Sequence, residues 1–370
     1  VEYTGDPVPA EKISGTASVD GETVAGTWSW ETGQALTELA DSGEKTVIFT
    51  PDDQVNFKPV EGTVTVTITK IDLGRAVITI TNQEELVFHP ASDDNSKGDG
   101  RIVSFTVTLD GKTLVRGTDY ILPDGLDEND EAGWAADAGE QSFDITGTGN
   151  YQGTGTVGYT ITKHTLGTPG IVQNVTKTYD GMDSLENTSY GLTDVFSSME
   201  TQTYQGTVEL KQDAGYEVTE ARYDSANAGS DKTVTYTIKL LNPNYQFEDG
   251  KDTLTFTANH ETTGGTFEIT KATAPKAADG AITVVNDSTA DYTLDLAKLL
   301  PVLDEGKSYG NVTYGTPDAQ LDTGYTASGV TVNENGVLAL KVAASADLDE
   351  GAVGTITIPV TTENYNAITL

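Results

Sequence analysis

One sequence pattern recurs along the chain and limits what it can fold into. An asparagine followed by an aromatic residue precedes a stretch in which β-branched and aromatic residues alternate with threonine or glycine. In the clearest copy, Asn150-Tyr151 leads to an alternating stretch over residues 157–161 that ends at Lys163. Asparagine and glycine favour tight turns, and a period of two is typical of a strand with one buried face. The pattern predicts a turn followed by a closing β-strand.

The spacing of this pattern predicts the domain organisation. The Asn-aromatic pairs begin at positions 56, 150, 244 and 364, so the steps between them are 94, 94 and 120 residues. Units of about 100 residues are large enough to bury their own core, unlike solenoid repeats of about 20–50 residues. We predict four modules with almost no linker: module one (residues 1–70), module two (71–163), module three (164–271) and module four (272–370), the last truncated at its C-terminal strand.

Strand patterns separated by turn signals occur in every module. In module two the turn signals recur every 8–12 residues or so, and Asp110-Gly111 is the strongest hairpin signal. The predicted strands include 46–51 in module one, 76–80, 86–88, 102–109, 114–120 and 141–145 in module two, 207–210 and 232–240 in module three, and 354–360 in module four. We therefore predict an all-β protein of tandem immunoglobulin-like β-sandwich modules in an elongated array.

Some segments predict other structures. Residues 34–40 predict one helical turn or a loop, residues 192–199 a short helix, and residues 294–300 a short helix or a strand that ends at Pro301. Module three has an extra segment between Asn244 and its closing strand. This segment predicts an added hairpin that projects outward.

Composition excludes several classes of partner. The chain has 21 Lys and Arg against 57 Asp and Glu, a formal net charge of −36, so we expect no nucleic-acid partner and no docking onto anionic membranes. The absence of cysteine excludes disulfides, thiolate metal sites and a cysteine nucleophile. No apolar stretch approaches the ~20 residues of a membrane helix, and the first residues do not resemble a signal peptide. We expect no membrane insertion within this segment, and we interpret it as part of a longer protein.

Two tryptophans, Trp28 and Trp30, are predicted to lie on one face of a strand. Such a pair is either part of a sandwich core or a platform on which a sugar ring stacks, and core packing is the commoner role. The tryptophans therefore favour a structural interpretation.

The turn sequences resemble those of a known group of repeats. Gly111-Lys112-Thr113-Leu114, followed by residues 117–120 and 147–154, resembles a repeat of large surface proteins of Gram-positive bacteria. Lys177-Thr178-Tyr179-Asp180-Gly181, followed by Asn227-Ala228-Gly229 and by residues 242–245, is similar to YDG-type repeats of haemagglutinin-like adhesins. Phe49-Thr50-Pro51-Asp52 before Asn56-Phe57 is similar to other members of this bacterial immunoglobulin-like group. The resemblance is strongest in modules two and three and implies a β-sandwich fold and an extracellular, cell-surface or cell-wall-attached location. It supplies no catalytic residue.

Two acidic loops are the candidates for a calcium site. Residues 93–99 have alternating carboxylates, but Lys97 occupies a position that should supply an oxygen ligand, and Ser104 stands where the final glutamate should be. Residues 124–131 have more carboxylates but no ligand spacing. The three histidines, His89, His164 and His260, lie in different segments and are expected to be surface or turn residues. The sequence therefore singles out no metal ligand and no cofactor.

No catalytic residue is singled out either. Without cysteine, and without a histidine near a serine or acid motif, a nucleophilic triad has no support, so we expect no enzyme. A covalent bond between a buried lysine and an Asn or Asp, known in some Gram-positive surface sandwiches, stays an alternative without an identifiable pair.

Two functions remain open at this stage. The first is a non-catalytic, monomeric stalk or spacer of a bacterial cell-surface protein. The alternative is an adhesive module that binds a host glycan or an extracellular-matrix protein, either through residues 247–265 or through a sheet edge open to strand addition.

Overall fold

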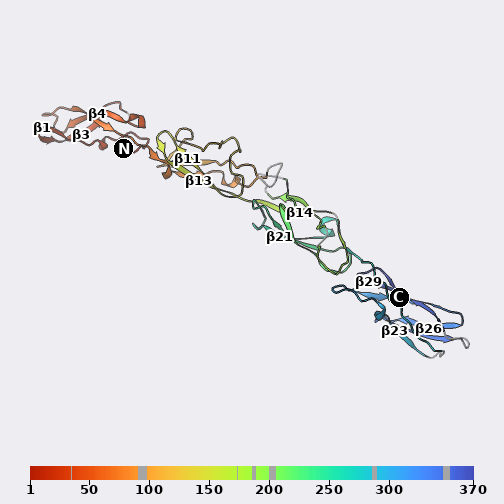
Figure 1. Ribbon diagram of the computed structural model, residues 1–370. Coiled ribbons are helices and arrows are strands. Elements are labelled where there is room, and N and C mark those ends of the chain that lie inside the picture. The colour runs from red at the N-terminus through yellow and green to blue at the C-terminus, as the bar shows by residue number, and fades with distance from the viewer. Residues whose placement is uncertain are drawn as a thin grey trace. The chain divides into compact units, whose positions relative to one another are not determined.

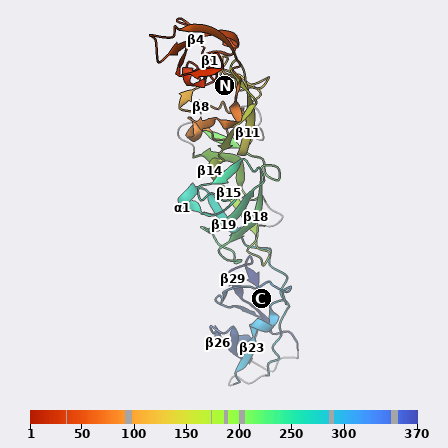
Figure 2. The ribbon, with the colours of Figure 1, turned by 90° about the vertical axis from the view of Figure 1, so that its left-hand side faces the viewer.

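The computed structural model describes the chain except residues 35, 91–97, 173, 186–188, 200–205, 286–289 and 345–350. The chain divides into two compact units, Val1–His164 and the described residues of 165–370. Strands dominate the ribbon (Figure 1), and the α-helical structure among the described residues is one turn, α1 (His260–Thr263), labelled in Figure 2. The all-β prediction is confirmed.

Every sheet is built from strands of one predicted module, although the module boundaries themselves stay a prediction. Module one has the pair β1 (Ala17–Val19) and β2 (Glu22–Val24), and the sheet β3 (Gly26–Trp30), β4 (Gly43–Pro51), β5 (Val60–Val66). Module two has the pair β6 (Ile71–Asp72) and β12 (Tyr151–Gln152), the sheet β7 (Val77–Ile80), β8 (Phe105–Leu109), β9 (Lys112–Thr113), and the sheet β10 (Tyr120–Ile121), β11 (Gly139–Gly147), β13 (Thr154–Ile161).

In the second unit, too, each sheet is built from strands of one predicted module. Module three has the sheet β17 (Thr207–Glu209), β16 (Leu192–Ser198), β14 (His164–Ile171), β20 (Tyr245–Phe247), the pair β15 (Asn174–Thr178) and β22 (Thr266–Thr270), and the sheet β18 (Tyr216–Tyr223), β19 (Val234–Leu240), β21 (Thr253–Ala258). Module four has the sheet β23 (Tyr292–Asp295), β27 (Val337–Ala344), β26 (Tyr325–Val332), the sheet β24 (Val312–Tyr314), β29 (Pro359–Thr362), β30 (Ile368–Thr369), and the pair β25 (Asp318–Leu321) and β28 (Gly354–Thr357). Short 3-10 turns lie at Ala10–Lys12, Leu39–Asp41, Leu73–Arg75, Gln83–Glu85 and Leu296–Leu299.

The closing strand has the predicted alternation. In β13 the side chains of Val157, Tyr159 and Ile161 are buried and the residues between them are exposed. β13 pairs with β11 along its whole length, from Gly139↔Ile161 to Thr146↔Thr154. The predicted burial pattern of this strand is therefore confirmed.

The predicted hairpin at Asp110-Gly111 is also confirmed. Both residues have positive φ, 49° and 80°, and Leu109 pairs with Lys112 across the turn. Two positive φ angles are typical of the type I′ turn that matches strand twist. Asp20-Gly21 makes the same turn between β1 and β2, with φ of 50° and 88°, so the β1–β2 hairpin of module one corresponds to the β8–β9 hairpin of module two.

Three predicted strands of module two are shorter or absent, two of them because side chains take over backbone hydrogen bonds. The amide of Asn82 donates to the Ile102 carbonyl (3.0 Å) and accepts from the Ser104 N–H (2.9 Å), so β8 begins only at Phe105. The Asp119 carboxylate accepts the Val115 N–H (2.7 Å) and turns the predicted strand 114–120 into a loop. Residues 86–88 make only an isolated parallel bridge, Val87↔Thr162.

Two predictions for module three are wrong. Residues 192–199 do not form a helix but the strand β16, which pairs with both β14 and β17. The extra segment does not project as a hairpin, because its strand β21 pairs with β19 from Val234↔Ala258 to Lys239↔Thr253. Ala258 is fully buried and Phe256 stacks on Tyr236 with ring centroids 5.3 Å apart. The extra residues therefore complete a core sheet, and the insertion itself is the capped turn α1.

The ambiguous segments combine the predicted alternatives. Residues 34–40 lead into the 3-10 turn at Leu39–Asp41, and residues 294–300 contain the end of β23 followed by a 3-10 turn. Residues 354–360 form parts of two strands, because β28 pairs with β25 whereas β29 pairs with β24 and β30.

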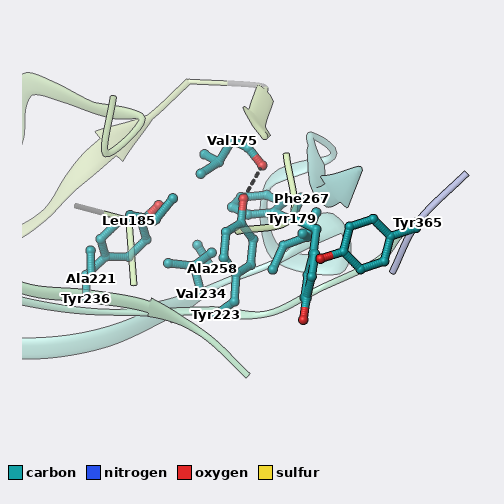
Figure 3. Close-up of a cluster of buried hydrophobic side chains, with 11 residues drawn as sticks. Val175, Tyr179, Leu185, Ala221, Tyr223, Val234, Tyr236, Ala258, Phe267 and Tyr365 are labelled. Atoms are coloured by element: carbon teal, nitrogen blue, oxygen red, sulfur yellow. Dashed lines mark hydrogen bonds between the residues drawn. The ribbon is translucent and has the colours of Figure 1, made fainter. Parts of the chain in front are cut away.

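Tyrosines fill the core of module three (Figure 3). The Tyr223 side chain is 1% exposed and its hydroxyl donates to the Val175 carbonyl (2.8 Å), while the Tyr236 hydroxyl donates to the Tyr190 carbonyl (2.7 Å). A buried phenol is tolerated where its hydroxyl finds a partner. Burial raises the pKa of Tyr223 to about 12 and that of Tyr216 to about 12.

These tyrosines predict the response of the fold to alkaline pH. An unfolded tyrosine loses its proton near pH 10, but the folded protein holds the proton at Tyr216 and Tyr223 up to about pH 12. Their contribution to stability is therefore complete below about pH 10 and is lost as pH rises toward 12, because the unfolded state then binds fewer protons. Absorbance at 295 nm should show a late tyrosine fraction that titrates together with loss of the circular dichroism signal. A single titration near pH 10 with the fold intact would contradict this prediction.

The position of β21 makes a second prediction. Ala258→Asp places a charge in the core of module three and should destabilise it by about 3 kcal/mol or more. The matched variant Thr257→Asp changes the adjacent exposed residue and should shift stability by about 0.5 kcal/mol at most. Urea unfolding followed by tyrosine fluorescence measures both. Equal, small effects would mean that β21 lies outside the core.

Candidate functional site: two equivalent module junctions

Two of the Asn-aromatic pairs, Asn150-Tyr151 and Asn364-Tyr365, lie where modules meet. We call the contacts of Asn150-Tyr151 with module one the module 1–2 junction, which lies within the first unit. We call the contacts of Asn364-Tyr365 with module three the module 3–4 junction, which lies within the second unit. The two junctions have the same construction from different residues.

At each junction the Asn-Tyr turn pairs in parallel with the first residue of its own module. Ile71 pairs with Tyr151 and donates its N–H to the Asn150 carbonyl (3.1 Å). Ala272 pairs with Tyr365 and donates to the Asn364 carbonyl (2.9 Å), and its own carbonyl accepts the Asn366 N–H (2.9 Å). The start of a module is thereby fixed against its last turn, about 80–90 residues later in the sequence.

The asparagine side chain reaches back to a loop of the preceding module. Asn150 accepts the Leu39 N–H (3.4 Å) and donates to the Glu38 carboxylate. Asn364 accepts the Ala228 N–H (2.8 Å) and donates to Asn227 (3.1 Å) and to the Ser308 carbonyl (3.0 Å). An amide group suits this position because it donates and accepts at once.

The tyrosine packs edge-on against an aromatic residue of the preceding module. Tyr3 and Tyr151 have ring centroids 5.7 Å apart, and Tyr179 and Tyr365 have centroids 5.4 Å apart, both in T-shaped geometry. Such pairs contribute about 0.5–1.5 kcal/mol beyond the burial of their area. Burial raises the pKa of Tyr151 to about 12 and also raises that of Tyr365.

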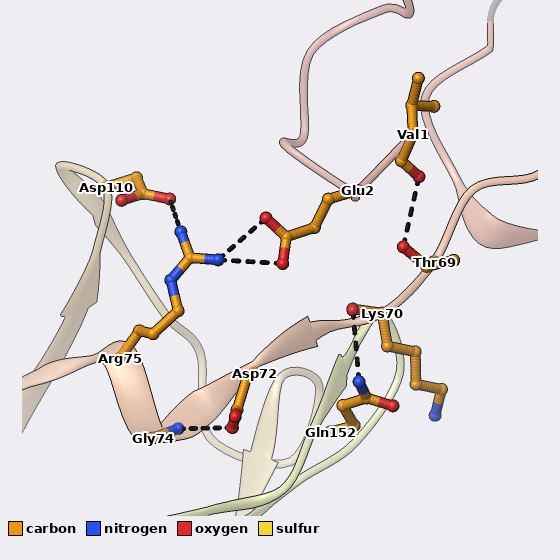
Figure 4. A network of polar contacts seen from close by, with 9 residues as sticks. All are labelled: Val1, Glu2, Thr69, Lys70, Asp72, Gly74, Arg75, Asp110 and Gln152. Atoms are coloured by element: carbon orange, nitrogen blue, oxygen red, sulfur yellow. Dashed lines mark hydrogen bonds and ion pairs between the residues drawn. The ribbon is translucent and has the colours of Figure 1, made fainter.

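A polar network surrounds the module 1–2 junction (Figure 4). Arg75 of module two contacts the Glu2 carboxylate of module one (2.8 Å) and Asp110 of its own module (3.2 Å). The Glu2 hydrogen bond raises the pKa of Arg75, so the guanidinium stays charged. The Gln152 amide donates to the Lys70 carbonyl (3.5 Å) at the boundary itself. Exposed ion pairs add little stability each, so their main effect is to fix orientation.

The Lys-Thr-Tyr-Asp-Gly motif has a structural role at the module 3–4 junction. The buried Lys177 ammonium donates to Asp180 (2.9 Å) and to the Met182 (2.9 Å) and Ser184 (2.7 Å) carbonyls, which uses all three of its donors. Gly181 has φ +91°, and a Cβ at this position would lie 2.8 Å from the Gly306 carbonyl oxygen of module four. The motif therefore shapes the loop that presents Tyr179 to the next module.

Sequence reasoning found the Asn-Tyr pairs but not their partners Tyr3 and Tyr179. A signal for them was present, because each tyrosine is followed two residues later by glycine, as Tyr3-Thr4-Gly5 and Tyr179-Asp180-Gly181. Each also follows a parallel contact with the closing strand, Glu2↔Thr69 and Thr178↔Thr270. The two tyrosines therefore occupy equivalent positions.

Of the two candidate calcium loops, the structure describes residues 124–131 in full. Residues 93–97 lie outside the described residues. In the loop at residues 124–131, Arg116 pairs with Glu128 (2.7 Å) and Arg101 pairs with Glu131 (2.8 Å), while the Trp134 indole donates to the Asp127 carbonyl (2.7 Å). Two of its carboxylates, Glu128 and Glu131, thus pair with arginines. Within the described residues, no group of three or more His, Asp or Glu side chains is placed to hold a metal ion.

One histidine is not where the sequence predicted. His164 is fully buried, with Nδ1 3.2 Å from the Phe88 carbonyl, so the prediction of a surface or turn position is wrong for it. His260 is exposed in α1, and His89 lies 3.5 Å from Asp99. The structure does not bring the three histidines together.

The tryptophans are half-buried rather than fully in a core. Trp28 packs on Phe49 with centroids 5.1 Å apart, and the Trp28 and Trp30 indoles donate to the Gly15 (3.3 Å) and Val8 (2.8 Å) carbonyls. Both rings are thereby engaged by their own module.

Comparison with known proteins adds no assignment. Neither a protein-family model nor a curated protein matches this sequence. None of the helices described is long and apolar enough to cross a bilayer. Support for a role of the junctions therefore comes from their own contacts and distances.

The module 3–4 junction predicts a sensitivity to one side chain. Asn364→Ala removes an acceptor for the Ala228 N–H and two donors, which should cost about 1–3 kcal/mol because these hydrogen bonds are partly buried. Trypsin cleavage after Lys271, at the boundary, should then become faster by about tenfold or more.

Asn366→Ala is the matched control, because Asn366 is exposed and only its backbone N–H takes part. It should leave the cleavage rate unchanged. Equal cleavage rates for the two variants would show that the Asn364 side chain does not hold the junction.

Proposed function

We propose that this chain is a non-catalytic structural stalk or spacer segment of a bacterial cell-surface protein. The observation that carries the proposal is the equivalence of the two junctions. Each combines a parallel backbone pairing, an asparagine that bridges two modules, and an edge-on tyrosine pair. A binding or catalytic role does not need this arrangement to recur, whereas a spacer needs every junction to resist bending.

The proposal extends to fold and location. We propose immunoglobulin-like sandwiches for the modules, an extracellular position on a cell surface or cell wall, and a monomeric state. The net charge of −36 supports the last point, because strongly like-charged surfaces repel one another. The resemblance of the turn motifs supports the first two.

The adhesive alternative loses its first candidate surface. The strand at Thr253–Ala258 belongs to the core sheet of module three, and Phe247 is 1% exposed. The exposed residues there are those of the turn 248–252, the outward-facing Thr255 and Thr257 of β21, and the short turn α1 with Gly264. A stalk therefore accounts for this segment better than a glycan-binding or protein-binding hairpin does.

Small-angle scattering tests the stalk. A compact module of about 100 residues has a diameter of roughly 35 Å. Four modules in line would therefore measure about 140 Å and have a radius of gyration of about 40 Å. A compact particle of 370 residues would have a radius of gyration of about 21 Å. We expect the maximum dimension and the radius of gyration calculated for four modules in line.

The variant Tyr179→Ala serves as the internal comparison. It removes the edge-on contact with Tyr365 and should broaden the distance distribution without unfolding the modules. A radius of gyration near 21 Å for the unmodified chain would overturn the stalk.

A further inference from the structure

An early strand of module three pairs in parallel with the strand that closes the module. β15 pairs with β22 from Asn174↔Thr266 to Thr178↔Thr270, without a register shift. The Tyr179 N–H extends this ladder by donating to the Thr270 carbonyl (2.8 Å). The chain therefore enters the β15–β22 ladder at one end and leaves it at the other.

Tension along the chain would act on opposite ends of this ladder. It would pull β15 at Asn174, its first residue, and β22 at Thr270, its last, and these two residues lie at opposite ends of the register. The hydrogen bonds of a parallel pair are evenly spaced along the strands, so they share the force and must break together. An antiparallel first and last strand would be pulled at the same end, and their bonds would break one at a time.

Buried side chains reinforce the ladder. The Tyr223 hydroxyl lies 2.8 Å from the Val175 carbonyl of β15 and 3.2 Å from the Glu268 carbonyl of β22, so both strands share its one O–H (Figure 3 draws the contact with Val175). Tyr223 is 1% exposed, which keeps water from replacing this bond. The buried Lys177 of β15 is in turn anchored to the loop at residues 180–184.

Comparable contacts elsewhere are shorter or less regular. The pairing of β14 with β16 is interrupted by register shifts between Leu166 and Pro169 and between Pro169 and Ile171. Among the described residues of module two, the contact that corresponds to β15–β22 is the isolated bridge Val87↔Thr162, with two hydrogen bonds of 2.8 Å. The long, unbroken ladder is therefore a feature of module three.

We propose that the β15–β22 ladder is a mechanical clamp, which lets module three carry tension along the chain. This role goes beyond spacing, and it rests on the proposed stalk only for its use, because a stalk transmits pull to whatever it holds. The direction of the ladder is a property of module three itself. Unfolding under force is governed by the unfolding rate, so the clamp acts by slowing that rate when the chain is pulled.

Single-molecule force measurements on the full chain test the dependence on direction. The chain has no cysteine, so pairs of introduced cysteines define where the handles pull. Handles at Asn174→Cys and Thr273→Cys pull the ladder from opposite ends, whereas handles at Asn174→Cys and Glu261→Cys pull it from the end where β22 begins; all three positions are exposed. At equal force the first pair should separate the ladder about a hundredfold more slowly or less, because several hydrogen bonds must break at once. Equal rates for the two pairs would overturn the clamp.

Two matched variants separate the clamp from general stability. Tyr223→Phe removes the shared O–H and should raise the unfolding rate in the opposite-ends geometry by about tenfold, because this bond breaks with the ladder. Tyr236→Phe removes a bond of the same kind to the Tyr190 carbonyl (2.7 Å) in the same core. It should change that rate by about twofold at most, since its bond is still intact when the ladder separates. Equal effects of the two variants on the rate would overturn the role of the ladder.

Failure of the clamp can be told apart from failure of the stalk. A rate that does not depend on the pulling direction overturns the clamp even where scattering shows an extended chain. A strong dependence on direction in a chain with a compact radius of gyration supports the clamp and overturns only the stalk.

Discussion

The backbone of the Asn-Tyr turn is the constraint on which the junctions depend. A turn between a central strand and a closing strand leaves a carbonyl and an N–H that neither strand can pair. Leaving such groups buried and unpaired costs about 1–3 kcal/mol each. At both junctions the first residue of the same module, Ile71 or Ala272, supplies the partner. The chain therefore enters each of these modules at the point where it last turns, beside the preceding module.

This entry point explains why one asparagine and one tyrosine act in two modules at once. A bend at the module 3–4 junction would separate Tyr179 from Tyr365 and would also break the bond between Asn364 and the Ala228 N–H. Both contacts are made by adjacent residues of one turn, so a bend that opens the junction breaks both. Resistance to bending thus arises from a few short contacts and does not require a large interface.

Sequence reasoning recovered the local features and missed those set by distant residues. The closing strand at residues 154–161 and the turn at Asp110-Gly111 follow from period and turn chemistry alone. The local pattern of residues 192–199 predicts a helix, whereas the strand β16 forms because it pairs with β14 and β17, which no local pattern reports. The length of the extra segment predicts a projecting hairpin, but the pairing of β21 with β19 depends on residues distant in the sequence. The junction partners Tyr3 and Tyr179 share a local signal, a glycine two residues later, but nothing local reports which turn each tyrosine contacts.

The repeating structural unit of this chain is therefore offset from its sequence modules. A junction combines an aromatic residue such as Tyr179, the first residue of the next module, Ala272, and a turn near the end of that module, Tyr365. A cut at Lys271 divides this unit, although it leaves each sheet whole. In module one, for example, Tyr3 packs edge-on against Tyr151 of the next module. Burial at each junction depends on which segment lies against the turn, so stability is shared between neighbours and is not a property of one module.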